Sequence, residues 1–190
     1  VLVVLSVSAK AQLPVNKKST RETIALYKNL CKLGKEGFLF GHQDDLAYGV
    51  NWRYEKGRSD VKDACGDYPG IYGWDIGGLE YASDKDIDGI PFKTTRKFVQ
   101  EGYERGGVIT FSWHVMSPLG GNKNAWDTTH GTVRSILPGG ENHTLYKEWL
   151  DKVAIFFHSL KGKKGEAIPI LFRPFHELTG NWFWWCRNAC

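Results

Sequence analysis

Four nearly continuous apolar runs most constrain what this chain can fold into. They read GFLFG (37–41), GIYGWDIG (70–77), GVITFSWH (107–114) and AIPILFRPFHE (167–177). A strand with one face in water alternates apolar and polar residues, whereas a continuous apolar run is typical of a strand buried on both faces. The runs therefore predict an α/β protein with a parallel sheet covered by helices.

Helical patterns accompany these runs, as such a sheet requires. Residues 94–106 and 144–162 carry apolar positions at helical spacing, and each segment precedes a strand. A further helix is predicted before the first strand, with a capping box made by Ser19 and Glu22 and a C-terminal stop at Gly34. Strand and helix alternate, which favours βα units.

Polar side chains end each apolar run. They are His42, Gln43 and Asp44 after the first, Asp75 on the second, His114 on the third, and His176 and Glu177 on the fourth. The carboxyl ends of the strands form the active face of a (β/α)8 TIM barrel, so this succession favours an enzyme of that fold. The loops at 43–60, 78–92 and 115–143 are long, which also indicates function.

Aromatic residues are abundant, with 8 Trp, 8 Tyr and 10 Phe among 190 residues. Trp combines a broad apolar face with one donor, which suits the C–H face and the hydroxyl edge of a sugar ring. The net charge of +4 is small and scattered, which argues against nucleic acid as a partner. A carbohydrate partner fits the composition better.

The N-terminus, VLVVLSVSAKAQ, looks like the tail of a secretory signal peptide with cleavage after Ala11. We expect residues 1–11 to be a truncated remnant of that peptide and 12–190 to be the N-terminal half of a barrel domain, although a buried strand is the alternative for the apolar N-terminus. The protein would then be secreted, periplasmic or on the cell surface, by bacterial-type export. No other segment is long and apolar enough to span a membrane.

The cysteines leave the disulfide state open. Cys186 and Cys190 are close enough in sequence to pair in an exported chain, but their spacing does not decide it. Cys31 falls on the apolar side of the first helix and is predicted to be a buried thiol. The sequence contains no C-x-x-C motif, which argues against a zinc site.

Glu177 suits the chemistry of glycoside hydrolysis. That reaction needs two carboxyl groups, one of which stays protonated so that it can donate to the leaving oxygen. The aromatic residues at 182–185 would shield Glu177 from water and so keep it protonated.

The segment RPFHELTGNWFWW (173–185) resembles the fourth-strand motif of glycoside hydrolase family 26, which consists chiefly of endo-β-1,4-mannanases. FGHQDD (40–45), YGWDIG (72–77) and SWH (112–114) resemble the first three strands of that family, in the right order. The resemblance implies a TIM barrel that hydrolyses mannan, glucomannan or galactomannan with retention and without metal or cofactor. A minority of the family cuts mixed-linkage glucan or 1,3-xylan, and the sequence does not choose among these polymers or between endo and exo action.

The resemblance also implies roles for individual residues. Glu177 would be the general acid/base, and His176 would orient the nucleophile. The substrate-binding residues would be His114, the stacking platforms Trp182 and Trp126, His42, and Asp75, which would also support the strand ends.

The chain stops soon after the fourth strand, at Cys190, whereas a complete barrel needs roughly 250 residues. We therefore expect only strands 1–4, the N-terminal half of the barrel. The family places its nucleophile on strand 7, so we expect this fragment by itself to be inactive.

Two alternatives differ in kind from a glycosidase. A metal-dependent barrel hydrolase would use His42, Asp44, His114 and His176 as ligands, but GHQDD lacks the paired H-x-H of such enzymes. A non-catalytic carbohydrate-binding protein would need only the aromatic platforms, and Glu177 favours an enzyme over it.

Overall fold

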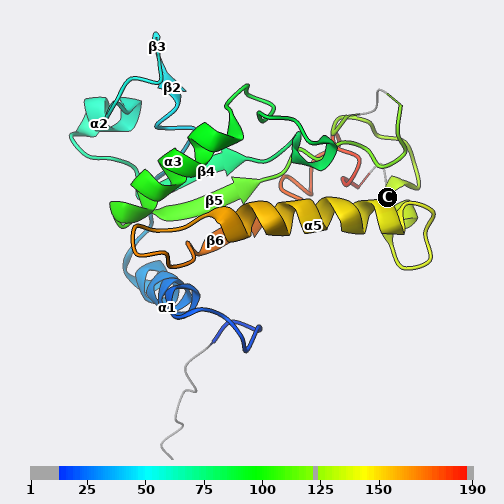
Figure 1. The fold of residues 1–190 in the computed structure, drawn as a ribbon, viewed down its shortest axis with the longest axis horizontal. Helices are drawn as coiled ribbons and strands as arrows, with labels where there is room; N and C mark the ends of the chain where they lie inside the picture. Colours follow the sequence, from blue (N-terminus) through cyan, green and yellow to red (C-terminus); the bar gives the residue numbers. More distant parts are fainter. Residues whose placement is uncertain (1–12, 122–123, 188–190) are drawn as a thin grey trace, which may run out of the picture.

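The computed structural model describes residues 13–121 and 124–187. The predicted signal remnant and Cys190 lie outside the described residues. A sheet of four strands forms the centre, in the order β1-β4-β5-β6 (Figure 1). These strands are β1 (Gly41–Gln43), β4 (Ile71–Asp75), β5 (Val108–Ser112) and β6 (Ile170–Arg173). All neighbouring pairs are parallel, which confirms the predicted sheet and its order.

Two helices cover the sheet where the sequence predicts them. They are α3 (Phe92–Glu104), which precedes β5, and α5 (His143–Ser159), which precedes β6 (Figure 1). The ring of Phe156 on α5 packs edge-on against Phe111 of β5, with centroids 5.9 Å apart, and against Phe92 of α3, with centroids 5.4 Å apart. One side chain thus joins both helices to the sheet.

Helix α1 (Arg21–Glu36) differs at both ends from the prediction. Its N-cap is Thr20, whose hydroxyl accepts a hydrogen bond from the Thr23 N–H at 3.1 Å, whereas the Ser19 hydroxyl donates to Asn16. The helix runs through Gly34, because a glycine inside a helix costs only about 1 kcal/mol and does not by itself stop it.

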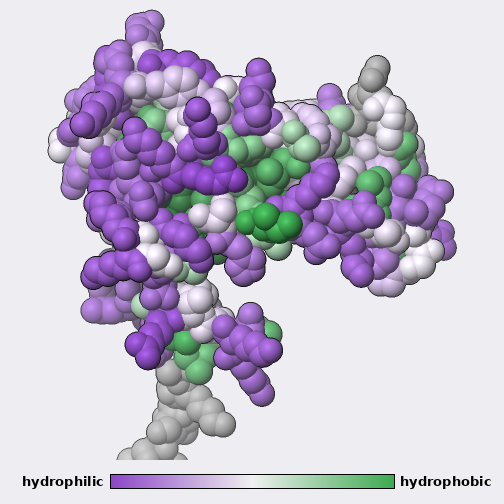
Figure 2. Space-filling model, viewed as in Figure 1, coloured by the Kyte–Doolittle hydropathy of each residue, from purple (hydrophilic) through white to green (hydrophobic). Residues whose placement is uncertain are grey.

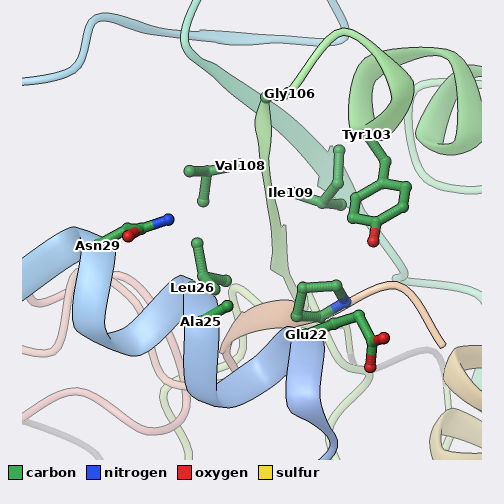
Figure 3. A pocket seen from close by; sticks show the side chains of 10 residues that line it. Glu22, Ala25, Leu26, Asn29, Tyr103, Gly106, Val108 and Ile109 are labelled. Carbon is green, nitrogen blue, oxygen red and sulfur yellow. The ribbon is translucent and has the colours of Figure 1, made fainter. Parts of the chain in front are cut away.

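The inward side of α1 faces the start of β5. Figure 3 shows Ala25 and Leu26 pointing toward Val108 across a cavity of about 250 Å3. Cys31 is exposed, so the prediction of a buried thiol is wrong. Since each residue advances about 100° around a helix, Cys31 is turned far from Asn29, which lines the cavity.

Strand β1 begins where the predicted strand ends. Gly41 is level with Ile71, the first residue of β4, and the Phe40 carbonyl accepts the Ile71 N–H at 3.1 Å just before the paired segment. Phe38 and Phe40 are 90% and 57% exposed instead of buried. The apolar run alone therefore did not predict which residues of β1 pair with β4.

Short elements that the sequence did not predict lie in or directly beside the long loops. They are β2 (Tyr48–Gly49), β3 (Trp52–Arg53), α2 (Asp60–Cys65), the 3-10 helix η1 (Leu79–Tyr81) and α4 (Thr132–Ile136). Strands β2 and β3 form an antiparallel pair of their own.

The surface seen in Figure 2 is mostly hydrophilic, with a hydrophobic area near the middle of α5. Ile155 of α5 is 71% exposed. Among residues 13–121 and 124–187, no helix combines the length and the apolar character that crossing a membrane requires.

We expect Phe156→Ala to lower the free energy of unfolding by about 3–5 kcal/mol, because it leaves a cavity between both helices and the sheet. Ile155→Ala, its neighbour on the exposed side of α5, should change that free energy by no more than about 0.5 kcal/mol. Urea unfolding of the complete protein measures both. Similar losses for the two variants would contradict this orientation of α5.

Candidate active site

The buried carboxylate of Asp75, at the end of β4, is the centre of the candidate site. It is 1% exposed and accepts hydrogen bonds from the Ser112 hydroxyl at 2.6 Å and the Gly77 N–H at 2.6 Å. Its Oδ2 also lies 2.9 Å from Nδ1 of His114. Burial alone would raise the pKa of Asp75, but the bonds from His114, Ser112 and Gly77 hold that pKa below its ordinary value. Asp75 is therefore ionised near neutral pH and accepts the Nδ1–H of His114.

The rings of His114 and His176 meet beyond the ends of β5 and β6. Their Nε2 atoms lie 3.1 Å apart, so one donates and the other accepts. Burial and, next, the neighbouring His114 lower the pKa of His176, which favours the neutral form of His176. The strand ends thus carry a chain of hydrogen bonds from Asp75 through His114 to His176.

Glu177 follows His176 in a turn with an unusual backbone. Its φ is 53°, in the left-handed region that few residues other than glycine adopt. Its carbonyl accepts a hydrogen bond from the Gly180 N–H at 2.9 Å, and its Oε2 accepts one from Nε1 of Trp182 at 2.8 Å. The side chain is exposed, so the expectation that rings shield it from water is wrong for the described residues. Trp182 offers Glu177 the N–H edge of its ring, and a neighbour at the edge leaves the carboxyl group open to solvent.

The aromatic run at 182–185 divides between surface and core. Trp182 is 48% exposed, whereas the other members, Phe183, Trp184 and Trp185, are buried. Nε1 of Trp185 donates to the carbonyl of His176 at 2.9 Å, and so fixes the backbone beside Glu177. Only Trp182 in this run has a broad open face that a sugar can stack on.

Trp126 reaches the site from the loop after β5. Its ring stacks on the ring of His114, with centroids 5.2 Å apart and planes inclined by 12°, and it is 51% exposed. The site therefore carries two open aromatic rings, Trp126 beside His114 and Trp182 beside Glu177.

The structure places His42 apart from this cluster. Its Nδ1 bonds to the carboxylate of buried Asp45 at 2.9 Å, and its ring lines a separate cavity of about 530 Å3 together with Val61 and Ala64. Within the described residues, no three His, Cys, Asp or Glu side chains gather as metal ligands. The four residues weighed as a metal set accordingly do not form one here.

Acidic residues of the loop after β4 also adjoin the site, and the sequence analysis did not select them. Burial and the nearby Asp75 raise the pKa of Asp88, which His114 partly offsets. Asp44 is fully buried, and burial, then Asp88 and Asp86, raise its pKa to about 8. The acid-rich stretch DKDIDG at 84–89 was the available signal.

Comparison with known proteins identifies relatives over most of the chain. Residues 15–190 match the model of glycosyl hydrolase family 26. A mannan endo-1,4-beta-mannosidase from Bifidobacterium adolescentis is 33% identical over 171 residues, covering 88% of this chain and 17% of that protein.

Solved structures are also similar to most of the chain. A GH26 beta-mannanase from Bacteroides ovatus has a TM-score of 0.86 and 48% identity, covering 90% of this chain and 50% of that one. A modular endo-beta-1,4-mannanase from Cellulomonas fimi has a TM-score of 0.78 and 32% identity, covering 90% of this chain and 39% of that one. The chain thus spans half or less of the length of these relatives.

We expect His176 to titrate below the ordinary histidine value of about 6.5, because burial and His114 disfavour its charged form. His114→Gln should raise the titration midpoint of His176 only part of the way back toward the ordinary value, because the His176 ring stays buried. The folded state then binds fewer protons than the unfolded state below about pH 6.5, so stability should fall as the pH drops from there toward the folded pKa.

Histidine NMR titration of the complete protein measures the midpoint. His143→Gln is the control, since His143, the first residue of α5, bonds to the Ile136 carbonyl of α4. A His176 midpoint above 6.5, or a midpoint that His114→Gln leaves unchanged, would show that burial and His114 do not govern the pKa of His176.

Proposed function

The chain belongs to glycosyl hydrolase family 26, whose relatives here form (β/α)8 barrels, and on that basis we propose that the protein hydrolyses β-1,4-mannosidic bonds with retention. The substrate would be mannan, glucomannan or galactomannan, cut within the chain. The names of the relatives support this substrate class.

The observation that carries the proposal is the placement of Glu177. A turn at the carboxyl end of β6 and the bond from Trp182 hold its carboxyl group beside His176. Since Oε2 accepts the indole N–H, we propose that Oε1 carries the proton given to the leaving oxygen. Glu177 would then, as a base, take a proton from the water that hydrolyses the glycosyl-enzyme.

The neighbouring residues would orient the reactants. We propose that His176 orients the nucleophile and that His114, fixed by Asp75, contacts the sugar beside the scissile bond. Trp182 and Trp126 would stack on sugar rings, as their open faces allow.

The nucleophilic carboxylate would come from a part of the barrel that these 190 residues do not include. A retaining mechanism places it about 5–5.5 Å from Glu177. We therefore propose that the 190-residue chain alone is inactive, because no covalent intermediate can form without the nucleophile.

We also propose that the protein is exported. The apolar segment at its N-terminus is typical of a signal peptide, and a mannan polymer is too large to diffuse into a cell.

We expect Glu177→Ala to reduce hydrolysis of β-1,4-mannan by the complete protein by several orders of magnitude. A substrate with an activated leaving group should lose less, because it needs little protonation on departure. Glu36→Ala, at the end of α1, is the exposed control and should leave both rates unchanged. Equal loss on the two substrates would exclude the acid role, and binding of mannan without any turnover would indicate a carbohydrate-binding protein.

NMR of the first product tests retention in the same assay. The β-anomer should form first, whereas an initial α-anomer would mean inversion and a different use of the two carboxyl groups.

Trp182 should contribute both its ring and its N–H. We expect Trp182→Phe, which keeps a ring but not the donor, to lower kcat/KM about tenfold, and Trp182→Ala to lower it further. Leu178→Ala, a 58% exposed neighbour, serves as the control. If both Trp182 variants merely lower the melting temperature and leave kcat/KM within twofold, Trp182 has only a structural role.

A further inference from the structure

Glu80 is a buried carboxylate that joins two loops behind the site. It lies in η1, after β4, and is 1% exposed. Its Oε2 accepts hydrogen bonds from the Gly78 N–H at 3.0 Å and from Nε1 of Trp113 at 3.1 Å. Its Oε1 accepts one from the Met116 N–H at 2.8 Å. The carbonyl of Glu80 also accepts a hydrogen bond from the Lys152 ammonium of α5.

The two bonds to the loop after β5 lie on either side of His114. Trp113 precedes His114 and Met116 follows it by two residues, so Glu80 fixes the short segment that carries the ring. Asp75 holds the ring itself through Nδ1. The position of His114 therefore depends on two carboxylates, one bonded to its ring and one bonded to its backbone segment.

We propose that Glu80 is a positioning residue for catalysis, which sets His114, and through it His176, by anchoring Trp113 and Met116. This inference rests on the proposed function for its effect on turnover. Its effect on the geometry of the two histidines does not depend on the substrate.

A contribution to stability alone does not explain a carboxylate at this position. Burial raises the pKa of Glu80 and so disfavours its charged form, and well-packed apolar residues often replace buried ionic groups without loss of stability. Three N–H donors converging on two oxygens instead define the relative placement of the loops after β4 and β5. Small displacements of groups beside a reacting centre can cost about a hundredfold in rate.

The chain offers a matched control in Asp60. Its carboxylate also accepts one tryptophan N–H, from Trp52, and one backbone N–H, from Val50. These bonds tie α2 to the β2–β3 pair and involve neither His114 nor its loop. Asp60→Asn therefore perturbs the same kind of interaction at a different place.

The test compares Glu80→Gln with Asp60→Asn in the complete protein. The side chain of Gln keeps the size of Glu but turns an NH2 group toward at least one of the three donors. We expect Glu80→Gln to lower kcat on mannan by about tenfold to a hundredfold, to change KM by less than threefold, and to shift the pH profile of kcat. Asp60→Asn should leave kcat within twofold even if it lowers the melting temperature.

Ring 15N NMR of the histidines separates this inference from the proposed function, because it needs no turnover. Glu80→Gln should shift the ring resonances of His114 and His176, and Asp60→Asn should not. If the wild-type protein fails to cleave mannan but these shifts occur, the substrate assignment fails and the positioning role of Glu80 stands.

Trp113→Phe removes the indole donor and provides a second test if Glu80→Gln does not fold. It should also lower kcat more than it affects KM. In the double variant the two effects on kcat should not add, because both substitutions break the same contact. Folded variants that keep kcat within twofold and leave the histidine resonances unmoved would overturn the proposal.

Discussion

The rest of the site depends on the ionised carboxylate of Asp75. The parallel register pairs Asp75 with Ser112, so the bond between their side chains reinforces the backbone pairing at the last step of the ladder. The same carboxylate accepts from Gly77, where the chain leaves β4, and holds the ring of His114. A charge that is almost fully buried tolerates the loss of such partners poorly, and this requirement couples the turn after β4 to the position of His114.

The carboxyl groups of Asp75 and Asp44 show how different hydrogen-bond donors and neighbouring charges give two buried groups different charge states. Asp75 and Asp44 are both buried, yet their pKa values move in opposite directions. Asp75 receives hydrogen bonds from a hydroxyl, a histidine ring and backbone N–H groups, whereas Asp44 receives one from the hydroxyl of Tyr48 and faces other acidic residues. One end of the sheet thus carries a fixed negative charge at Asp75 beside a carboxyl group that burial and its acidic neighbours keep protonated.

The sequence predicted the two helices that cover the sheet, because their apolar positions recur over long segments, and it predicted the order of the strands. It did not predict features that depend on neighbours in the folded structure. The start of β1 follows from where β4 begins, and the exposure of Cys31 follows from how little of α1 the sheet touches. The direction of the His42 side chain could not be predicted either, because a strand of three residues shows no usable alternation. A hydrogen bond to Asp45 holds the ring instead. Glu80 had no sequence signal, since two of its three donors come from a loop more than thirty residues away.

These contacts divide the support of the site unequally among the strands. His114 belongs to the loop after β5, yet the two carboxylates that fix it, Asp75 and Glu80, both belong to the end of β4 and the turn that follows. Glu177 depends on the turn after β6 and on Trp182 within the same segment. Within the part of the chain that the structure describes, the contacts named here for the side of the site that holds Glu177, the proposed acid/base, lie in β4, β5, β6 and the segments that follow them, Lys152 of α5 included. The geometry of that side can be set by this part of the barrel, and the nucleophile that we propose for the other strands would approach a carboxyl group that is already in place.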